Sequence, residues 1–243
     1  MSALEIRKDL EKIFEKAQEG RYDMSASRFV ESFVKPFDKE LIAPMSAKKL
    51  GITTEEVLKL WEEKAEKGRL AGSVLHKHLE NSFTGSNKPT GLDGSVISTY
   101  MKNDPEYRDL VNNNIRLVDI FYDTVKEYLA PMLVEHRVAD EDLSILGIPD
   151  YLFQDLRTGN LILFDLKHGK PITDKGKNKM LGPFCQVKDG NLQKNSLQLS
   201  FYKFIIERNS SYQISDMIIG HIGDKYNSYR ALDMQDIIAQ YYS

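Results

Sequence analysis

Cysteine is almost absent from this chain of 243 residues. Cys185 is the only one, so no internal disulfide and no cysteine-ligated zinc or iron–sulfur site can form. Long apolar runs are missing too, and none approaches the ~20 residues that cross a bilayer. The first twenty residues mix Glu, Lys and Arg and lack the apolar core of a secretory signal. These absences predict a cytoplasmic protein that has no membrane partner.

Charge of one sign is not in excess either. The net charge of −3 does not indicate a general affinity for nucleic acid. The distribution is more informative, because six lysines and a single acid, Asp174, lie between Lys167 and Lys188. This basic segment, which includes Lys170 and Lys175, is either an ordinary solvated loop or a contact to a phosphate backbone.

Two acids and a lysine are the most informative residues that the chain does contain. Asp150 precedes one short apolar stretch and Asp165 lies in the next, with a turn signal at residues 157–160 between them. We therefore expect a hairpin that brings the two carboxylates together. Side chains alternate along a strand, so Asp165 and Lys167 share one face, and Ile162, Phe164 and Leu166 are expected to face the core.

Facing acids repel one another, and a bound cation would offset that repulsion. Hard divalent cations prefer oxygen ligands, and a lysine beside them can stabilise developing phosphate charge or orient a water. The alternative is an ordinary exposed hairpin, in which Asp at a strand end carries no function.

The apolar spacing changes period in the middle of the chain. The first half predicts helices at residues 4–18, 39–50, 54–68, 71–81 and 104–129, with a strand or short helix at 25–34. A polar loop is expected at 84–94. The second half predicts strands at 132–140, 148–156, 161–167 and 214–222, with helices at 192–208 and 231–242. Helices that lead into a small sheet crossed by a helix indicate one α/β domain.

Two helical faces carry further polar groups. Gly72, His76 and Glu80 recur every fourth residue, so the imidazole could serve as a metal ligand, although a lone helical histidine is more often an ordinary surface or core residue. Gln198 and Tyr202 share a face of the predicted helix at 192–208 and could hold a phosphate or a base edge. A packed polar edge is the plainer interpretation of that pair.

Taken together, these motifs resemble the RecB-like branch of the PD-(D/E)XK nuclease superfamily. The order and spacing of five motifs agree, and they fall at Gly72–His76, Glu135, Gly147–Asp150, Asp165–Lys167 and Gln198–Tyr202. The similarity covers residues 21–208 and extends to single-domain exonucleases of bacteriophages and to the mitochondrial genome maintenance exonucleases. His168 departs from the Thr or Ser that often follows the lysine.

The resemblance implies a restriction-endonuclease-like core with a helical N-terminal half, in a single nuclease domain over residues 1–243. Residues 1–130 would form a mainly helical cap with the histidine-bearing helix, residues 131–222 the catalytic core, and residues 223–243 a helical tail.

It also implies roles for the matched residues. Asp150 and Asp165 would bind Mg²⁺ or Mn²⁺, with His76 and the Leu166 carbonyl completing the shell and Glu135 assisting. Lys167 would position or activate water for hydrolysis that leaves a 5′ phosphate. The remaining predicted residues would contact DNA, and they are Gln198, Tyr202, Lys170 and Lys175. No iron–sulfur cluster is expected.

The expected function is therefore a metal-dependent DNA exonuclease that acts on strand ends, with single-stranded DNA favoured. Its setting would be recombination, repair or phage replication in a bacterial or phage-infected cell, where recombination or replication proteins are expected partners. Two alternatives stay open: a structure-specific endonuclease, and a non-catalytic DNA-binding subunit of the same fold.

Overall fold

The computed structural model describes residues 2–86, 96–176 and 178–243. The chain divides into two compact units. The sheet unit comprises Met1–Lys35 and Ile120–Ser243, and the helical unit comprises Pro36–Asp119. The predicted α/β class is confirmed, whereas the single nuclease domain stays a prediction. Lys177 and most of the polar loop predicted at 84–94 lie outside the described residues.

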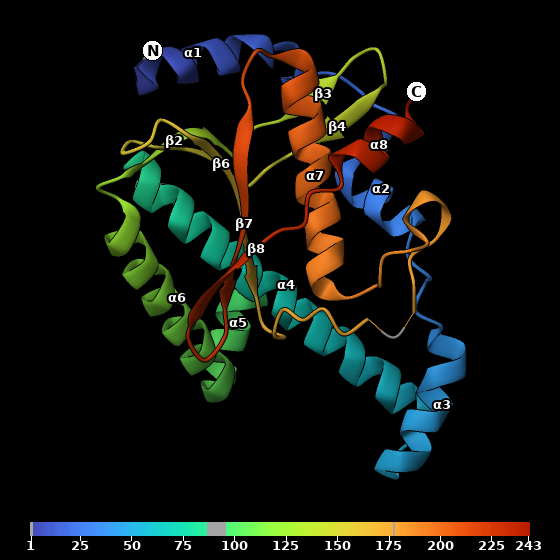
Figure 1. Cartoon of the computed structure of the whole chain (residues 1–243). Helices are drawn as coiled ribbons and strands as arrows, with labels where there is room; N and C mark the ends of the chain where they lie inside the picture. Colours follow the sequence, from blue (N-terminus) through green and yellow to red (C-terminus); the bar gives the residue numbers. More distant parts are fainter. Residues whose placement is uncertain (1, 87–95, 177) are drawn as a thin grey trace. The chain divides into compact units, whose positions relative to one another are not determined.

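The sheet unit is built on a five-stranded mixed sheet with the order β2-β5-β6-β7-β8. Its strands are β2 (Leu129–Val134), β5 (Tyr151–Asp155), β6 (Leu161–His168), β7 (Ile214–Ile222) and β8 (Tyr226–Arg230). Only β6 and β7 run parallel, because helix α7 (Asn191–Asn209) returns the chain between them. Figure 1 shows α7 beside these two strands. The carboxyl ends of β6 and β7 therefore lie together, the usual place for ligands in α/β sheets.

The predicted hairpin between β5 and β6 is confirmed. Asp155 accepts a hydrogen bond from the Arg157 amide at 2.9 Å, and Gly159 takes a left-handed φ of +78° that closes the turn. The resulting register sets Tyr151 opposite Phe164.

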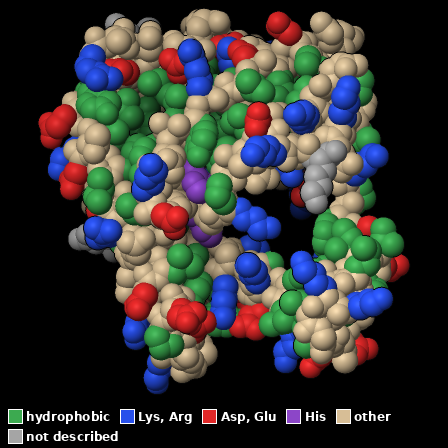
Figure 2. Space-filling model, turned by 60° about the horizontal axis from the view of Figure 1, so that its bottom comes forward, with side chains coloured by type: hydrophobic (Ala, Val, Ile, Leu, Met, Phe, Trp, Pro, Cys, Tyr) green, Lys and Arg blue, Asp and Glu red, His purple; other side chains and the backbone are tan. Residues whose placement is uncertain are grey.

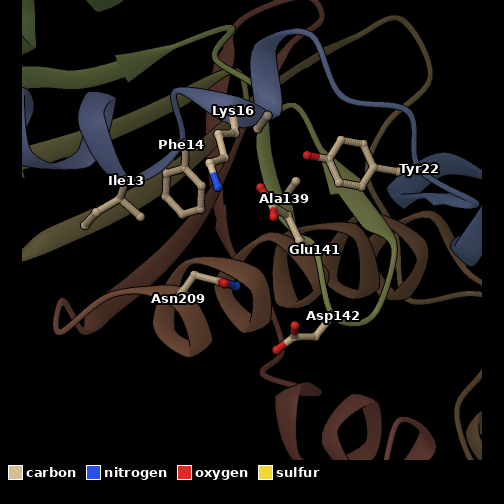
Figure 3. A pocket seen from close by; sticks show the side chains of 9 residues that line it. Ile13, Phe14, Lys16, Tyr22, Ala139, Glu141, Asp142 and Asn209 are labelled. Atoms are coloured by element: carbon tan, nitrogen blue, oxygen red, sulfur yellow. The ribbon is translucent and has the colours of Figure 1, made fainter.

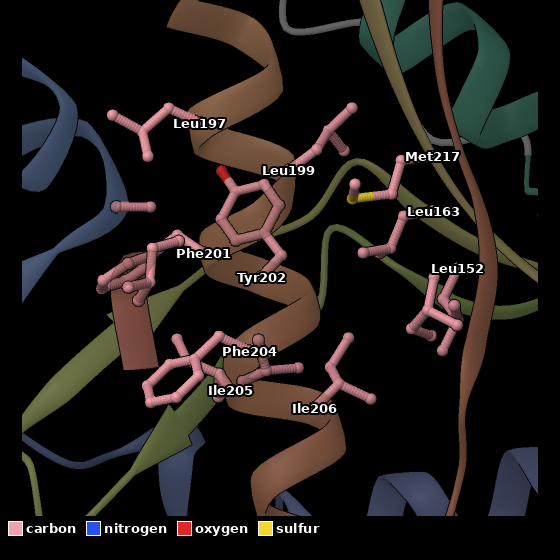
Figure 4. Close-up of a cluster of buried hydrophobic side chains, with 14 of the residues drawn as sticks. Leu152, Leu163, Leu197, Leu199, Phe201, Tyr202, Phe204, Ile205, Ile206 and Met217 are labelled. Carbon is pink, nitrogen blue, oxygen red and sulfur yellow. The ribbon is translucent and has the colours of Figure 1, made fainter. Parts of the chain in front are cut away.

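Both faces of β6 are covered: Phe164 and Leu166 are buried as predicted and Ile162 is half-buried, but Leu163 of the other face is buried as well. Leu163, on the opposite face, lies in the main core with residues of α7 (Figure 4). Phe164 instead stacks on Phe121, with ring centroids 5.0 Å apart. A strand covered on both faces has a nearly continuous apolar sequence, which hides the alternation between its faces.

Smaller elements complete the sheet unit. Strands β1 (Met24–Ser25), β4 (Ile145–Gly147) and β3 (Val138–Asp140) form a second, three-stranded sheet. The helical segments are α1 (Ala3–Ile13), α2 (Ala26–Ser32), α8 (Gln235–Tyr241) and the 3₁₀ turns η1 (Lys16–Gln18) and η2 (Gly182–Phe184).

Two predicted elements of this unit were wrong in part. The strand predicted at 132–140 is two strands, β2 and β3, in different sheets, because Glu135 breaks it with φ of +46°. The tail at 223–243 was expected to be helical, but it begins with β8, whose polar sequence pairs with the edge of β7.

The helical unit contains α3 (Lys39–Leu50), α4 (Thr54–Thr84), α5 (Val96–Asn103) and the larger part of α6 (Pro105–Val125). A capping box begins α4, since Thr53 and Glu56 each accept a hydrogen bond from the other's amide. In the described part of the chain, no helix is both long and apolar enough to span a membrane.

The two helices predicted at 54–68 and 71–81 are one continuous helix of 31 residues. An interior glycine such as Gly68 costs only about 1 kcal/mol of helix stability, and tertiary contacts readily offset it. Here the Lys67 ammonium lies 2.8 Å from the Asp104 carboxylate, and the Lys67 backbone carbonyl accepts a hydrogen bond of 2.9 Å from the Tyr107 hydroxyl.

Candidate metal centre

Three segments of the sheet unit meet where β2 ends and β5 begins. The register sets Val134 opposite Tyr151 and Tyr151 opposite Phe164. The next positions, Glu135, Asp150 and Asp165, therefore form a row across the sheet. The Glu135 amide donates to the Asp150 carbonyl at 2.9 Å, which ties the first two segments together.

Asp150 is fixed by the backbone of β6. It is 8% exposed, and its Oδ2 accepts a hydrogen bond of 2.7 Å from the Leu166 amide. This bond spans the hairpin and holds the Asp150 carboxylate next to the residue that follows Asp165. The two predicted carboxylates are thus brought together as the hairpin argument expected.

Asp165 and Lys167 form an ion pair on one face of β6, in which the carboxylate is buried and the lysine half-buried. The Lys167 ammonium lies 2.9 Å from Oδ1 of Asp165 in a hydrogen bond and 2.8 Å from Oδ2 in an ionic contact. The Asp165 side chain is only 2% exposed. Burial alone would lower the pKa of Lys167, but Asp165, Asp150 and Glu135 together outweigh it and raise that pKa above its ordinary value. Lys167 is therefore a cation.

Helix α7 supplies Tyr202 and Gln198. The Gln198 amide donates a 2.7 Å hydrogen bond to the Tyr202 hydroxyl, so the predicted shared face is confirmed. Burial, followed by the charge of Asp165, raises the pKa of Tyr202. The phenol keeps its proton and remains a hydrogen-bond donor next to the carboxylates.

Gly147 makes room for that tyrosine. A Cβ at this position would lie 2.5 Å from a ring carbon of Tyr202, closer than real side chains approach. The Gly147–Asp150 motif thus combines a carboxylate with a glycine that lets α7 pack closely against β4.

Glu135 was predicted to lie on the first strand, but it lies immediately after that strand. Its φ of +46° is in the left-handed region, which is uncommon for a residue with a side chain. Such strain costs of order 1–3 kcal/mol and gathers at functional sites. The side chain is exposed at the edge of the carboxylate row.

His76 belongs to the other unit. It is half-buried on α4, where neighbouring Lys77 pairs with Glu80 at 2.6 Å and His78 with Asp119 at 2.6 Å. Its role as a metal ligand stays a prediction.

Lys170 and Lys175 are exposed in the segment that follows β6. In the described ranges no hydrogen bond or ion pair holds either side chain. On the face drawn in Figure 2, basic and acidic side chains are interspersed, in keeping with the small net charge.

One residue that the sequence patterns did not single out lies beside the cluster. His221 pairs with Lys167 in the register of β7 and β6 and is only 2% exposed. The available signal was an imidazole within the otherwise apolar end of a buried strand.

Two cavities of the sheet unit lie apart from these residues. One, of about 260 Å³, is lined by α1, η1 and β3 and includes Lys16, Glu141 and Asp142 (Figure 3). The other, of about 350 Å³, is apolar and lies against the face of the sheet that carries Phe164. Neither is lined by a predicted site residue. The carboxylate cluster is therefore identified by its charges and contacts.

The donor atoms of the cluster suit a hard divalent cation. Carboxylate oxygens are the ligands that Mg²⁺ and Mn²⁺ prefer, and the cluster contains neither thiolate nor thioether. No protein-family model and no curated protein matches the chain.

Proposed function

We propose that the chain is a divalent-metal-dependent deoxyribonuclease that hydrolyses phosphodiester bonds at DNA strand ends, with single strands favoured. The observation that carries the proposal is the cluster at the carboxyl end of β6, where two buried carboxylates, Asp150 and Asp165, lie together beside the ammonium of Lys167. With Glu135, three carboxylates surround one ammonium. The two remaining negative charges are what a divalent cation would balance.

Asp150 and Asp165 would hold Mg²⁺ or Mn²⁺, with the Leu166 carbonyl and Glu135 as further ligands. Such a cation, when bound, lowers the pKa of a water and offsets charge on a phosphoryl group. The buried hydrogen bond from Leu166 fixes Asp150 in advance, so little side-chain entropy is lost on binding.

Lys167 would stabilise the negative charge that develops on the phosphate. Its raised pKa keeps it protonated at neutral pH, which favours positioning of the attacking water over proton abstraction. The ammonium has three N–H donors and two contacts to Asp165, so one donor remains for a phosphate.

Tyr202 and Gln198 would hold the DNA strand at the cut. The Tyr202 phenol keeps its proton, so it can donate to a phosphate oxygen. Lys170 and Lys175 would contact the strand farther from the cut and contribute affinity without sequence preference. Recombination, repair or phage replication in the cytoplasm would be the setting.

Cleavage of defined DNA substrates tests the proposal. Linear and circular DNA, single-stranded and duplex, would be followed over time with Mg²⁺ or Mn²⁺. We expect only linear DNA to be degraded, and both Asp165→Ala and Lys167→Ala to abolish degradation. Asp216→Ala is the matched control, because Asp216 is a carboxylate of the same sheet that pairs instead with Arg230.

Nicking of circular DNA would show that the protein is a structure-specific endonuclease and not an exonuclease. Retained DNA binding without cleavage under any metal would refute the catalytic proposal and leave a DNA-binding subunit of this fold.

A further inference from the structure

His221 lies next to Lys167 on the site face of the sheet. In the parallel ladder of β6 and β7, Asp165 pairs with Ile219 and Lys167 pairs with His221. Paired residues of neighbouring strands are about 4.8 Å apart and point to the same face. The imidazole is therefore one strand removed from the lysine, on the side away from Asp150.

The imidazole is buried without compensation. In the part of the chain that the structure describes, neither ring nitrogen of His221 has a hydrogen-bond partner, and both are shielded from solvent. A neutral imidazole carries one donor and one acceptor, and leaving both unsatisfied destabilises the fold.

The neighbours of His221 on its own face of the sheet are apolar along β7 and polar on the adjacent strands. Ile219 is the buried residue of β7 on that face, the Tyr229 ring lies edge-on with its centroid 6.5 Å away, and the register sets Asn227 of β8 and Lys167 of β6 opposite the imidazole. Gly223 leaves just enough room for the ring, since a Cβ there would lie 3.1 Å from Cε1. Within the described residues neither ring nitrogen gains a hydrogen bond in this environment, so folding alone does not explain the histidine.

In the proposed reaction, a second hydrogen-bond acceptor besides Asp165 would help to hold the Lys167 ammonium in place. Its ammonium has three N–H donors, and both of its contacts described above go to Asp165. The four-carbon side chain is flexible, so a contact besides Asp165 would fix the direction of the ammonium when it also faces a phosphate.

We propose that His221 is a positioning residue for Lys167, whose ammonium donates to the unprotonated ring nitrogen of His221 when it faces the scissile phosphate. This inference rests on the proposed nuclease function and adds a residue to its site. The same contact would satisfy the acceptor nitrogen that the fold leaves without a partner.

The test compares His221→Leu with His221→Gln in the full-length protein, using the cleavage assay and thermal unfolding. Leucine removes the acceptor, whereas glutamine keeps one. For His221→Leu we expect kcat to fall roughly tenfold to hundredfold, as for other misplaced catalytic groups. KM should be unchanged, and the melting temperature equal or higher. His221→Gln should restore part of kcat. Ile214→Val, at the far end of the same strand, is the packing control and should keep wild-type kcat.

Wild-type kcat in His221→Leu would overturn the positioning role while leaving the nuclease intact. A fall of kcat and melting temperature together, with no recovery in His221→Gln, would show a purely structural role. A wild-type protein that cleaves no DNA would overturn both proposals. Cleavage by the wild type but not by Asp165→Ala would show that the nuclease stands, so that the result for His221→Leu then bears on the positioning role alone.

Discussion

Replacing Gly147 by alanine should displace Tyr202 and weaken the sheet unit. The new Cβ would lie 2.5 Å and 2.9 Å from two ring carbons of Tyr202 and 3.4 Å from a methyl group of Val138. Ordinary contact begins near 3.4 Å, so the ring or β4 must move by about 1 Å. Overpacking of this kind costs about 1–3 kcal/mol, which corresponds to a fall of about 2–12 °C in the melting temperature of a chain of this size.

Thermal unfolding and DNA cleavage measured side by side check this expectation. Gly68→Ala is the matched control, because nothing lies within 4 Å of its Cβ and alanine favours a helix interior. It should raise stability by about 0.5–1 kcal/mol. In a Tyr202→Ala background the cost of Gly147→Ala should largely disappear. An unchanged melting temperature for Gly147→Ala, or an equal cost in both backgrounds, would refute the clash.

Three further perturbations have expected outcomes. Thr53→Ala removes the cap of α4 and should lower the free energy of unfolding by about 0.5–2 kcal/mol in chemical denaturation; no change would contradict the capping role. Arg157 lowers the pKa of Asp155 to about 2, so the stability from this pair is present above the ordinary value of 3.8 and is lost as pH falls toward 2. Arg157→Gln should make the free energy of unfolding less dependent on pH in this acid range, and an unchanged pH dependence would contradict the pairing. The pKa of Lys167 is raised, so its contribution is complete below the ordinary value of 10.5 and is lost as pH rises through the folded value. Lys167→Met should therefore lose less stability than wild type in an alkaline titration, and equal losses would argue against the ion pair.

Local chemistry in the sequence was enough to predict the hairpin and its two acids. Turn residues at 157–160 and alternation along β6 are short-range signals, and the contacts of Asp150 and Lys167 follow from them. The boundaries of β7 were predicted correctly for the same reason, since a compact apolar run ends at a glycine turn.

What the sequence did not reveal depends on residues far apart in the chain. The three-stranded sheet joins β1 to β4 across more than a hundred residues, and each strand is too short to have a period of its own. His221 becomes notable only once the parallel pairing sets it beside Lys167. The break at Glu135 is a backbone conformation that side-chain patterns do not encode.

The most direct test of the central claim is the cleavage of an end-labelled linear single strand in Mn²⁺ by wild type and Asp165→Asn. The substitution keeps the shape of a side chain that is 2% exposed and removes only its charge. We predict progressive shortening of the strand by the wild type and none by the variant, with both proteins folded. Equal cleavage by the two would contradict a catalytic role for the carboxylate cluster, and no cleavage by either would contradict the nuclease itself.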